Sequence, residues 1–182
     1  MEQLARLVRQ AAKRPEVRKA VARVYSAVQK EIDTRRPLCV SSGRCCRFEE
    51  YGHRLYITTI ELAAFTHDLE SQPHTAPLER GASTQIDASR LNLQQLPEPP
   101  NPAGCPYQVG KLCGVHAIRP FGCRIFFCDP TASEWQNQAY ERFHAELKLL
   151  HEQLSVPYYY VEWRSALAAL NSFAVHFTPD RA

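Results

Sequence analysis

The chain has 182 residues, of which 45% are hydrophobic and 23% are charged, and its formal net charge is +3. A chain of this length buries roughly 70% of the surface that its unfolded form exposes, so it holds one sizeable core without cross-links, and its composition argues against disorder. No stretch approaches the roughly 20 apolar residues of a membrane span, and no apolar secretory segment follows the N-terminal basic residues. We expect a single cytoplasmic domain over 1–182 with no membrane span.

The first 36 residues predict two helices with an excess of positive charge. Residues 1–36 contain ten Lys or Arg and four Asp or Glu, a net of +6. Pro15 is tolerated in the first turn of a helix but not in its interior, so we expect helices over 2–13 and 15–33. A solvated face is the simpler interpretation of the charge, and contact with RNA, anionic lipid or an acidic partner is the alternative. Helical spacing predicts a buried face made of Val17, Val21, Val24, Val28 and Ile32.

The next stretch combines a loop, a short extended piece and a helix. A proline and a glycine mark 37–48 as a loop, and "RLYIT" after it is typical of a short extended piece. Thr58 and Glu61 have the spacing of a capping box, in which the two side chains satisfy the free backbone N–H groups of a helix start. This spacing predicts a helix over about 59–69.

Beyond this helix the sequence predicts a long loop and then further helices. Six prolines in 71–104 indicate a loop, with a short extended piece near 83–93. Thr131 and Glu134 repeat the capping-box spacing and predict a helix of about twenty residues before Pro157. "YYYVEW" suits either strand or helix, "WRSALAALN" predicts a last helix, and "FAVHF" predicts an extended tail. The apolar stripe of the long helix is Trp135, Ala139, Phe143, Leu147, Leu150 and Leu154.

The seven cysteines are the main chemical signal. An odd number leaves one thiol over in a fully paired disulfide framework, and in a reducing cytoplasm such a set is more often metal-binding or catalytic. Loops held by flanking helices can converge several thiolates on one point, which suits metal ligands. We therefore expect all seven to be candidate ligands of a site shared by two groups, Cys39, Cys45 and Cys46, then Cys105, Cys113, Cys123 and Cys128.

Spacing and charge leave the type of centre open. The paired C-x2-C motifs of zinc fingers are absent from the sequence, and no acidic residue lies between Cys105 and Cys128, where several basic residues do. Cations favour thiolate and partly neutralise either an iron–sulfur cluster or a zinc ion held by four thiolates. We expect one of these two, with iron–sulfur slightly favoured. Either one centre with spare thiols or two sites completed by His or carboxylate would fit. Adjacent Cys45 and Cys46 are expected to point in opposite directions, as in extended chain.

One part of the cysteine-rich region resembles a known family. "CGVHAIRPFGCR" at 113–124, with "CPYQVGKLC" before it and the adjacent cysteines near residue 45, resembles the C-x-[IV]-[YH]-x-x-R-P-x-x-C-R signature of the YkgJ-type cysteine-cluster family, described as zinc- or iron-chelating. The resemblance covers roughly 38–128 and implies a metal or iron–sulfur site assembled from both halves, without naming a reaction. The family's first motif is C-x2-C-x2-C-C, and Ser42 stands where its second cysteine is expected. Cys128, which that signature lacks, is a candidate replacement.

The sequence thus predicts a mainly α fold with few short strands. Basic N-terminal helices over 1–36 and C-terminal helices over 129–182 are expected to support irregular cysteine-rich loops over 38–128, organised around a metal centre. The expected function is metal binding with a redox or accessory role. One alternative is a thiol-based redox enzyme or sensor that uses a cysteine near Arg44 or Arg124. The other is a metal-shaped interaction module whose basic helix contacts a macromolecule, although nucleic-acid binding is not expected.

Overall fold

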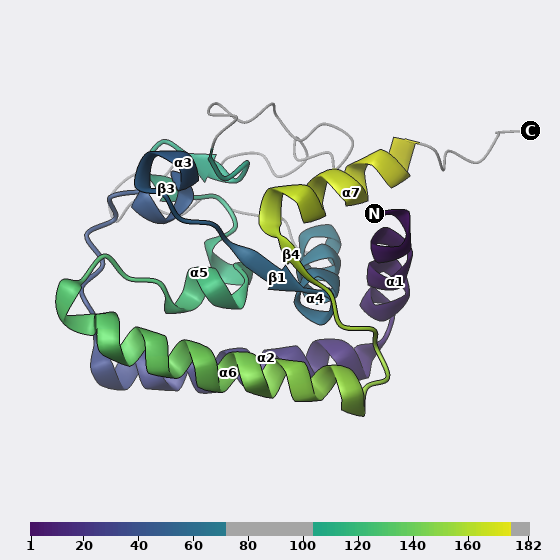
Figure 1. The fold of residues 1–182 in the computed structure, drawn as a ribbon, viewed down its shortest axis with the longest axis horizontal. Helices are drawn as coiled ribbons and strands as arrows, with labels where there is room; N and C mark the ends of the chain where they lie inside the picture. The colour runs from purple at the N-terminus through teal and green to yellow at the C-terminus, as the bar shows by residue number, and fades with distance from the viewer. Residues whose placement is uncertain (72–103, 176–182) are drawn as a thin grey trace, which may run out of the picture.

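Two long helices form the frame of the molecule. The computed structural model describes residues 1–71 and 104–175, and it is mainly helical, as predicted. Helices α2 (Pro15–Arg35) and α6 (Ser133–Gln153) lie side by side along one edge, as Figure 1 shows. The predicted apolar stripes of both helices are largely buried between them and the rest of the core.

Three shorter helices pack together near the start of α2. Helix α1 (Glu2–Ala12) contacts both α4 (Thr59–Ser71) and α7 (Trp163–Val175), and α4 also contacts α2 (Figure 1). Trp163, at the start of α7, is 1% exposed. The cysteine-bearing segments lie toward the opposite end of the two long helices (Figure 1).

The N-terminal helices lie where the sequence predicts them. Pro15 occupies the first turn of α2, where the missing N–H costs nothing because that group has no partner within the helix. The helix ends at Arg36, which adopts the left-handed conformation and donates its N–H to the Ile32 carbonyl at 2.7 Å. The valines of the predicted face, Val17, Val21, Val24 and Val28, are at most 1% exposed.

A two-stranded sheet joins the two halves of the chain. Strand β1 (Tyr56–Thr58) pairs antiparallel with β4 (Tyr160–Glu162), with Ile57 opposite Val161. The "RLYIT" segment is therefore extended as predicted, and part of the ambiguous "YYYVEW" segment forms its partner strand. Because β1 leads directly into α4 and β4 into α7, this pairing fixes both helices relative to each other.

The cysteine-bearing half consists of short elements rather than loops alone. A second two-stranded sheet is the hairpin of β2 (Gln108–Val109) and β3 (Leu112–Cys113). Between the short helices run irregular connections, held by backbone hydrogen bonds. The short helices are η1 (Arg44–Cys46), α3 (Phe48–Tyr51), η3 (His116–Ile118), α5 (Phe121–Ile125) and η4 (Pro130–Ala132).

Two local predictions near the C-terminus are wrong. The predicted long helix is present as α6 with 21 residues, but the Thr131–Glu134 capping box does not form. Asp129 accepts hydrogen bonds from the Thr131 N–H and hydroxyl and caps η4 instead. The expected extended tail is also partly wrong, because α7 continues to Val175. The extended piece expected near 83–93 and most of the proline-rich 71–104 lie outside the described residues.

The remaining sequence predictions concern surfaces. Arg6 and Lys13 are exposed, and Arg9 is half-buried, so a basic surface exists on α1. None of the helices within 1–71 and 104–175 is long and apolar enough to cross a membrane. Cytoplasmic localisation stays a prediction.

Candidate metal centre

Five of the seven cysteines gather where the two cysteine groups meet. Cys45 and Cys46 lie in η1, Cys105 precedes β2, Cys113 ends β3 and Cys123 lies in α5. We call these five side chains the thiol cluster. All seven cysteines carry free thiols. The fold thus brings together cysteines from both groups, which are far apart in the sequence.

Cys46 is the centre of the thiol cluster. Its thiol lies close enough to the thiols of Cys105, Cys113 and Cys45 for each of them to raise its pKa. Cys46 and Cys105 are each 6% exposed, and the Cys105 N–H donates to the Cys46 carbonyl at 2.7 Å. The extended chain expected at Cys45 and Cys46 is absent, because both lie in the tight helical turn η1. Cys46 is buried, whereas Cys45 lines a cavity.

The thiol cluster changes the acidity of its members. Hydrogen bonding to Cys46 lowers the pKa of Cys45 to about 6 and that of Cys113 to about 7, and it also lowers the pKa of Cys105. The same contacts, first that with Cys105, raise the pKa of Cys46. Burial raises the pKa of Cys123, where the neighbouring thiolates add to the effect. The arrangement therefore favours thiolate at the cysteines around Cys46. A metal bound there would displace the proton of Cys46, because thiolate is the form that binds metal.

Two buried N–H groups near the thiol cluster lack a hydrogen-bond partner within the described residues. They are Nε of Arg119 and Nε1 of Trp163. The Trp163 indole faces Cys105 closely enough to lower the pKa of that thiol, although it completes no hydrogen bond within the described chain. A buried donor without a partner costs about 1–3 kcal/mol, so acceptors near Arg119 Nε and Trp163 Nε1 would stabilise this region.

Arg119 directly follows η3, and its positive charge lies close enough to the thiol cluster to change the pKa values of several thiols. It lowers the pKa of Cys45 and of Cys113 and opposes the rise in the pKa of Cys123. Its Nη1 lies 2.6 Å from Nε2 of His116, which is exposed and so lies on the outer side of the guanidinium. Partial desolvation of the ring and the charges of Arg119 and Arg124 lower the pKa of His116, so the neutral imidazole accepts this hydrogen bond.

Glu61 holds α5, which carries Cys123, against α4. One carboxylate oxygen accepts from the Thr58 N–H at 3.1 Å and hydroxyl at 2.9 Å, which confirms the predicted helix start. The other accepts from the Tyr25 hydroxyl at 3.1 Å and the Phe121 N–H at 3.0 Å. Burial raises the pKa of Glu61, against these four hydrogen bonds. The residue thereby links α2, α4 and the first residue of α5.

Two glycines allow the cysteine-bearing segments to approach each other. Gly43, with φ +73°, adopts the left-handed conformation, and an added Cβ would lie 2.9 Å from Gln108 Nε2 on the hairpin that carries Cys113. At Gly122 an added Cβ would lie 2.5 Å from Leu55 Cδ1. The first contact brings the hairpin to η1, and the second brings α5 to the start of β1.

Cys39 and Cys128 are placed apart from these five thiols. Cys39 is exposed, whereas Cys128 is half-buried and its Sγ lies 3.7 Å from Ser42 Oγ. Asp129 Oδ2 accepts the Leu38 N–H at 3.1 Å, so the segment before Cys39 is attached to the segment after Cys128.

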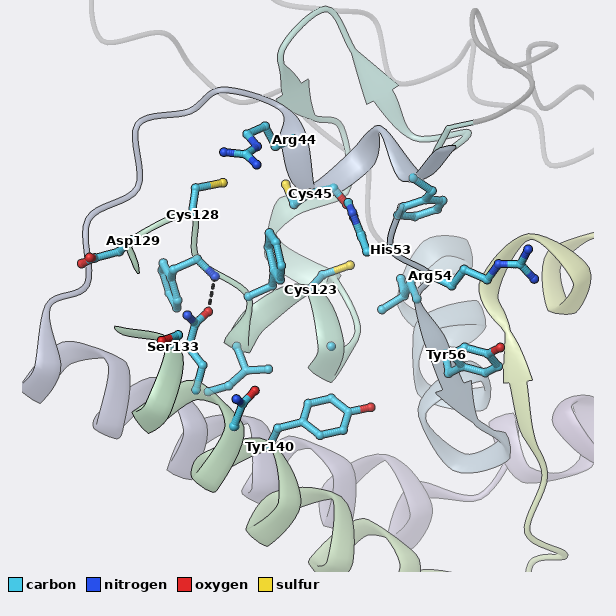
Figure 2. A pocket seen from close by; sticks show the side chains of 18 of the residues that line it. Arg44, Cys45, His53, Arg54, Tyr56, Cys123, Cys128, Asp129, Ser133 and Tyr140 are labelled. Carbon is cyan, nitrogen blue, oxygen red and sulfur yellow. Dashed lines mark hydrogen bonds between the residues drawn. The ribbon is translucent and has the colours of Figure 1, made fainter. Parts of the chain in front are cut away.

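A cavity of about 560 Å³ opens beside the thiol cluster. Cys45, Cys123 and Cys128 lie on its wall, as Figure 2 shows, and the other wall residues come mainly from the β1 approach, α5 and α6. The His53 ring stacks on Phe126 with centroids 5.3 Å apart and meets Phe48 edge to face at 5.4 Å.

The thiols are gathered without being arranged as ligands. Within the two described stretches, no three His, Cys, Asp or Glu side chains are positioned to hold a metal ion.

The chain matches no protein-family model, no curated protein and no solved structure. The residues present still suit a thiolate-bound metal, because such a centre would supply anionic sulfur to the unpartnered N–H groups of Arg119 and Trp163.

The sequence names all seven cysteines as candidates without separating the five that cluster, and it does not predict the residues that support them. The spacing of Glu61 indicates only a helix start, whereas its bonds to Tyr25 and Phe121 join residues 36 and 60 positions away. Trp163 gives no signal, because nothing in the sequence places the start of α7 beside Cys105. The sequence shows Arg119 as a cation close to cysteines in the chain, but it does not show that the Nε of this residue is buried without a hydrogen-bond partner.

Proposed function

We propose that this protein binds a metal through the thiol cluster, as an iron–sulfur cluster or a zinc ion. The observation that carries the proposal is the gathering of five free thiols, drawn from four segments, around Cys46. Burying several thiols as packed hydrophobes requires no such convergence. The resemblance of 113–124 to the YkgJ-type family points to the same chemistry.

The proposed ligands are Cys46, Cys105 and Cys113, with one of Cys45, Cys123 and Cys128, which share a cavity wall, as the fourth. Zinc takes four thiolates in structural sites, and common iron–sulfur clusters also take four. Bound zinc supplies a cross-link between segments, and an iron–sulfur cluster supplies one-electron transfer. Arg119 and Trp163 would donate their N–H groups to the sulfurs, and Glu61 would keep α5 in place.

The position of Cys128 adds support from the family pattern. Ser42 occupies the place of the family's second motif cysteine, and Cys128 is the thiol beside it. A serine hydroxyl is a poor substitute for thiolate as a soft-metal ligand, so a thiol from another segment at this place is consistent with compensation. Cys128 also shares a cavity wall with Cys45 and Cys123.

Anaerobic purification with metal analysis tests the proposal. A brown protein that contains iron and acid-labile sulfide identifies an iron–sulfur cluster, and a colourless protein with one zinc per chain identifies zinc instead. Cys46→Ser should lose the metal, whereas Cys39→Ser should keep it because Cys39 is exposed and outside the thiol cluster. Absence of any stoichiometric metal from chain produced with iron and zinc in the medium overturns the proposal.

A thiol-based redox enzyme or sensor is the second candidate. The observation that favours it is that Cys45 lines an open cavity while its thiol contacts that of Cys46. Such an enzyme would be metal-free when reduced, with Cys45 alkylated much faster than the other thiols. Mass spectrometry of briefly alkylated protein distinguishes the candidates, because a bound metal protects Cys45, Cys46 and their neighbours together.

A further inference from the structure

The cavity beside the thiol cluster has the properties of a ligand site. We propose that it binds a small aromatic anion, a flat ring system carrying a carboxylate or phosphate. The proposal depends on the proposed function in one respect only, the metal that the thiols next to the ligand would bind. Binding of the ligand itself depends on the cavity walls. Its volume of about 560 Å³ lies within the roughly 300–1,000 Å³ of small-molecule sites.

Flat apolar surfaces on the cavity wall favour an aromatic body. Phe126 is 42% exposed although its ring is held in place by stacking on His53 at 5.3 Å with an interplanar angle of 14°. Tyr56, on the wall near β1, is 38% exposed and stacks on Tyr160, which is not a wall residue. Exposed rings that are already fixed lose little side-chain entropy when a planar ligand stacks on them.

The charges on the cavity wall favour an anion. Asp129 is the acid among the described wall residues, and its oxygens already accept from the Leu38 N–H, the Thr131 N–H and the Thr131 hydroxyl. The two arginines, Arg44 and Arg54, make no side-chain ion pair within the described chain. The wall therefore has cations whose charge is not balanced by a free carboxylate.

Arg44 is the group that we expect to bind the anionic end. Its guanidinium lies 4.3 Å from the Tyr51 ring centroid, a contact that orients the group and leaves its N–H donors available. Figure 2 shows Arg44 at the end of the cavity with Cys45 and Cys128, whereas the Arg54 guanidinium points away from these thiols. Arg54 thus provides a control of the same charge on the same cavity.

The position of the thiols links this ligand to the thiol cluster. Cys45 and Cys123 belong to both the cluster and the cavity wall, whereas Cys46 and Cys105 are each 6% exposed. The cluster therefore has a closed side and a side that faces the cavity. A ligand bound through Arg44 and Phe126 would lie against the open side, next to whatever the thiols hold.

Calorimetric titration of the full chain with 2-naphthoate tests the proposal. We expect binding to wild type, with affinity about 10- to 100-fold weaker in Arg44→Ala, substantial recovery in Arg44→Lys and little change in Arg54→Ala. 2-Methoxynaphthalene, which lacks the charge, and hexanoate, which lacks the ring, should both bind more weakly than 2-naphthoate. No binding of 2-naphthoate by wild type, or equal affinity for the neutral analogue, overturns the proposal.

A cavity-filling pair gives an independent readout. Asn137→Trp places a large ring in the cavity from α6 and should abolish binding, whereas Gln138→Trp lies on the same helix outside the wall and should not. Equal binding by both variants contradicts the site.

Metal content is measured in every sample. If the protein binds 2-naphthoate but never contains metal, the ligand site is supported and the proposed metal binding is contradicted. If the protein contains metal but does not bind 2-naphthoate, the metal binding is supported and the ligand site is contradicted.

Discussion

Ser42 Oγ and Cys128 Sγ lie 3.7 Å apart, although the two residues are 86 positions apart in the chain. The Ser42 hydroxyl also accepts the Arg44 N–H at 3.4 Å, which fixes it at the start of η1. A thiol from the segment after α5 therefore lies beside Ser42, the residue that stands where the resemblance to the YkgJ-type family leads one to expect a cysteine.

Exchanging the two residues tests whether this placement is compensation. Cys128→Ser should lower metal content, and the double variant Cys128→Ser with Ser42→Cys should restore it, because the second thiol would occupy the same position. The measurement is metal per chain in freshly purified protein. Full metal content in Cys128→Ser would show that Cys128 is not a ligand.

The central position of Cys46 predicts unequal effects of single cysteine changes. Cys46→Ser should weaken metal binding by more than the roughly 100-fold of outer-shell changes, because its thiol contacts three others. Cys39→Ser, at an exposed position, should retain wild-type affinity. Competition titration with a zinc chelator measures both. Similar losses in the two variants would contradict the assignment of the thiol cluster as the site.

Arg119 is expected to stabilise the anionic centre. Arg119→Gln removes both the charge and the unpartnered Nε–H, and it should lower metal affinity about 10- to 100-fold. Arg119→Lys keeps the charge alone, so its affinity should fall between those of wild type and Arg119→Gln. If the centre is an iron–sulfur cluster, Arg119→Gln should also lower its reduction potential, because a lost cation disfavours the added electron. Arg54→Gln is the charge-matched control, and a loss of affinity there equal to that in Arg119→Gln would contradict a specific role for Arg119.

Glu61 predicts a pH dependence of the free energy of unfolding. Glu61→Gln should destabilise the fold by about 1–3 kcal/mol at low pH, because the amide nitrogen accepts no hydrogen bond, whereas both oxygens of the protonated acid still accept. Burial raises the pKa of Glu61 in the folded chain above the ordinary value of 4.5. Its contribution is therefore complete below pH 4.5 and is lost as pH rises through the raised pKa. Urea unfolding measured from below pH 4.5 upward should show that the difference in free energy of unfolding between wild type and Glu61→Gln becomes smaller as pH rises. A difference that grows with pH would count against this role of Glu61.

Helix positions follow from local sequence. The valine spacing, Pro15 and the Thr58–Glu61 pair each act within a few residues, and α2 and α4 begin where these signals predict. The start of α6 does not follow in the same way, because Asp129 competes for Thr131, a choice between two local caps that spacing alone does not decide.

The sequence by itself determined a mainly helical fold and two groups of cysteines capable of meeting. Only the tertiary structure decided which thiols meet, because that depends on contacts between distant segments: the Gly43 approach to the hairpin, the Glu61 bond to Phe121, and Trp163 beside Cys105. It also decided that Cys39 lies outside the thiol cluster and that Cys128 lies beside Ser42. Local propensity sets where a helix begins, whereas convergence of side chains is set by packing of the whole core.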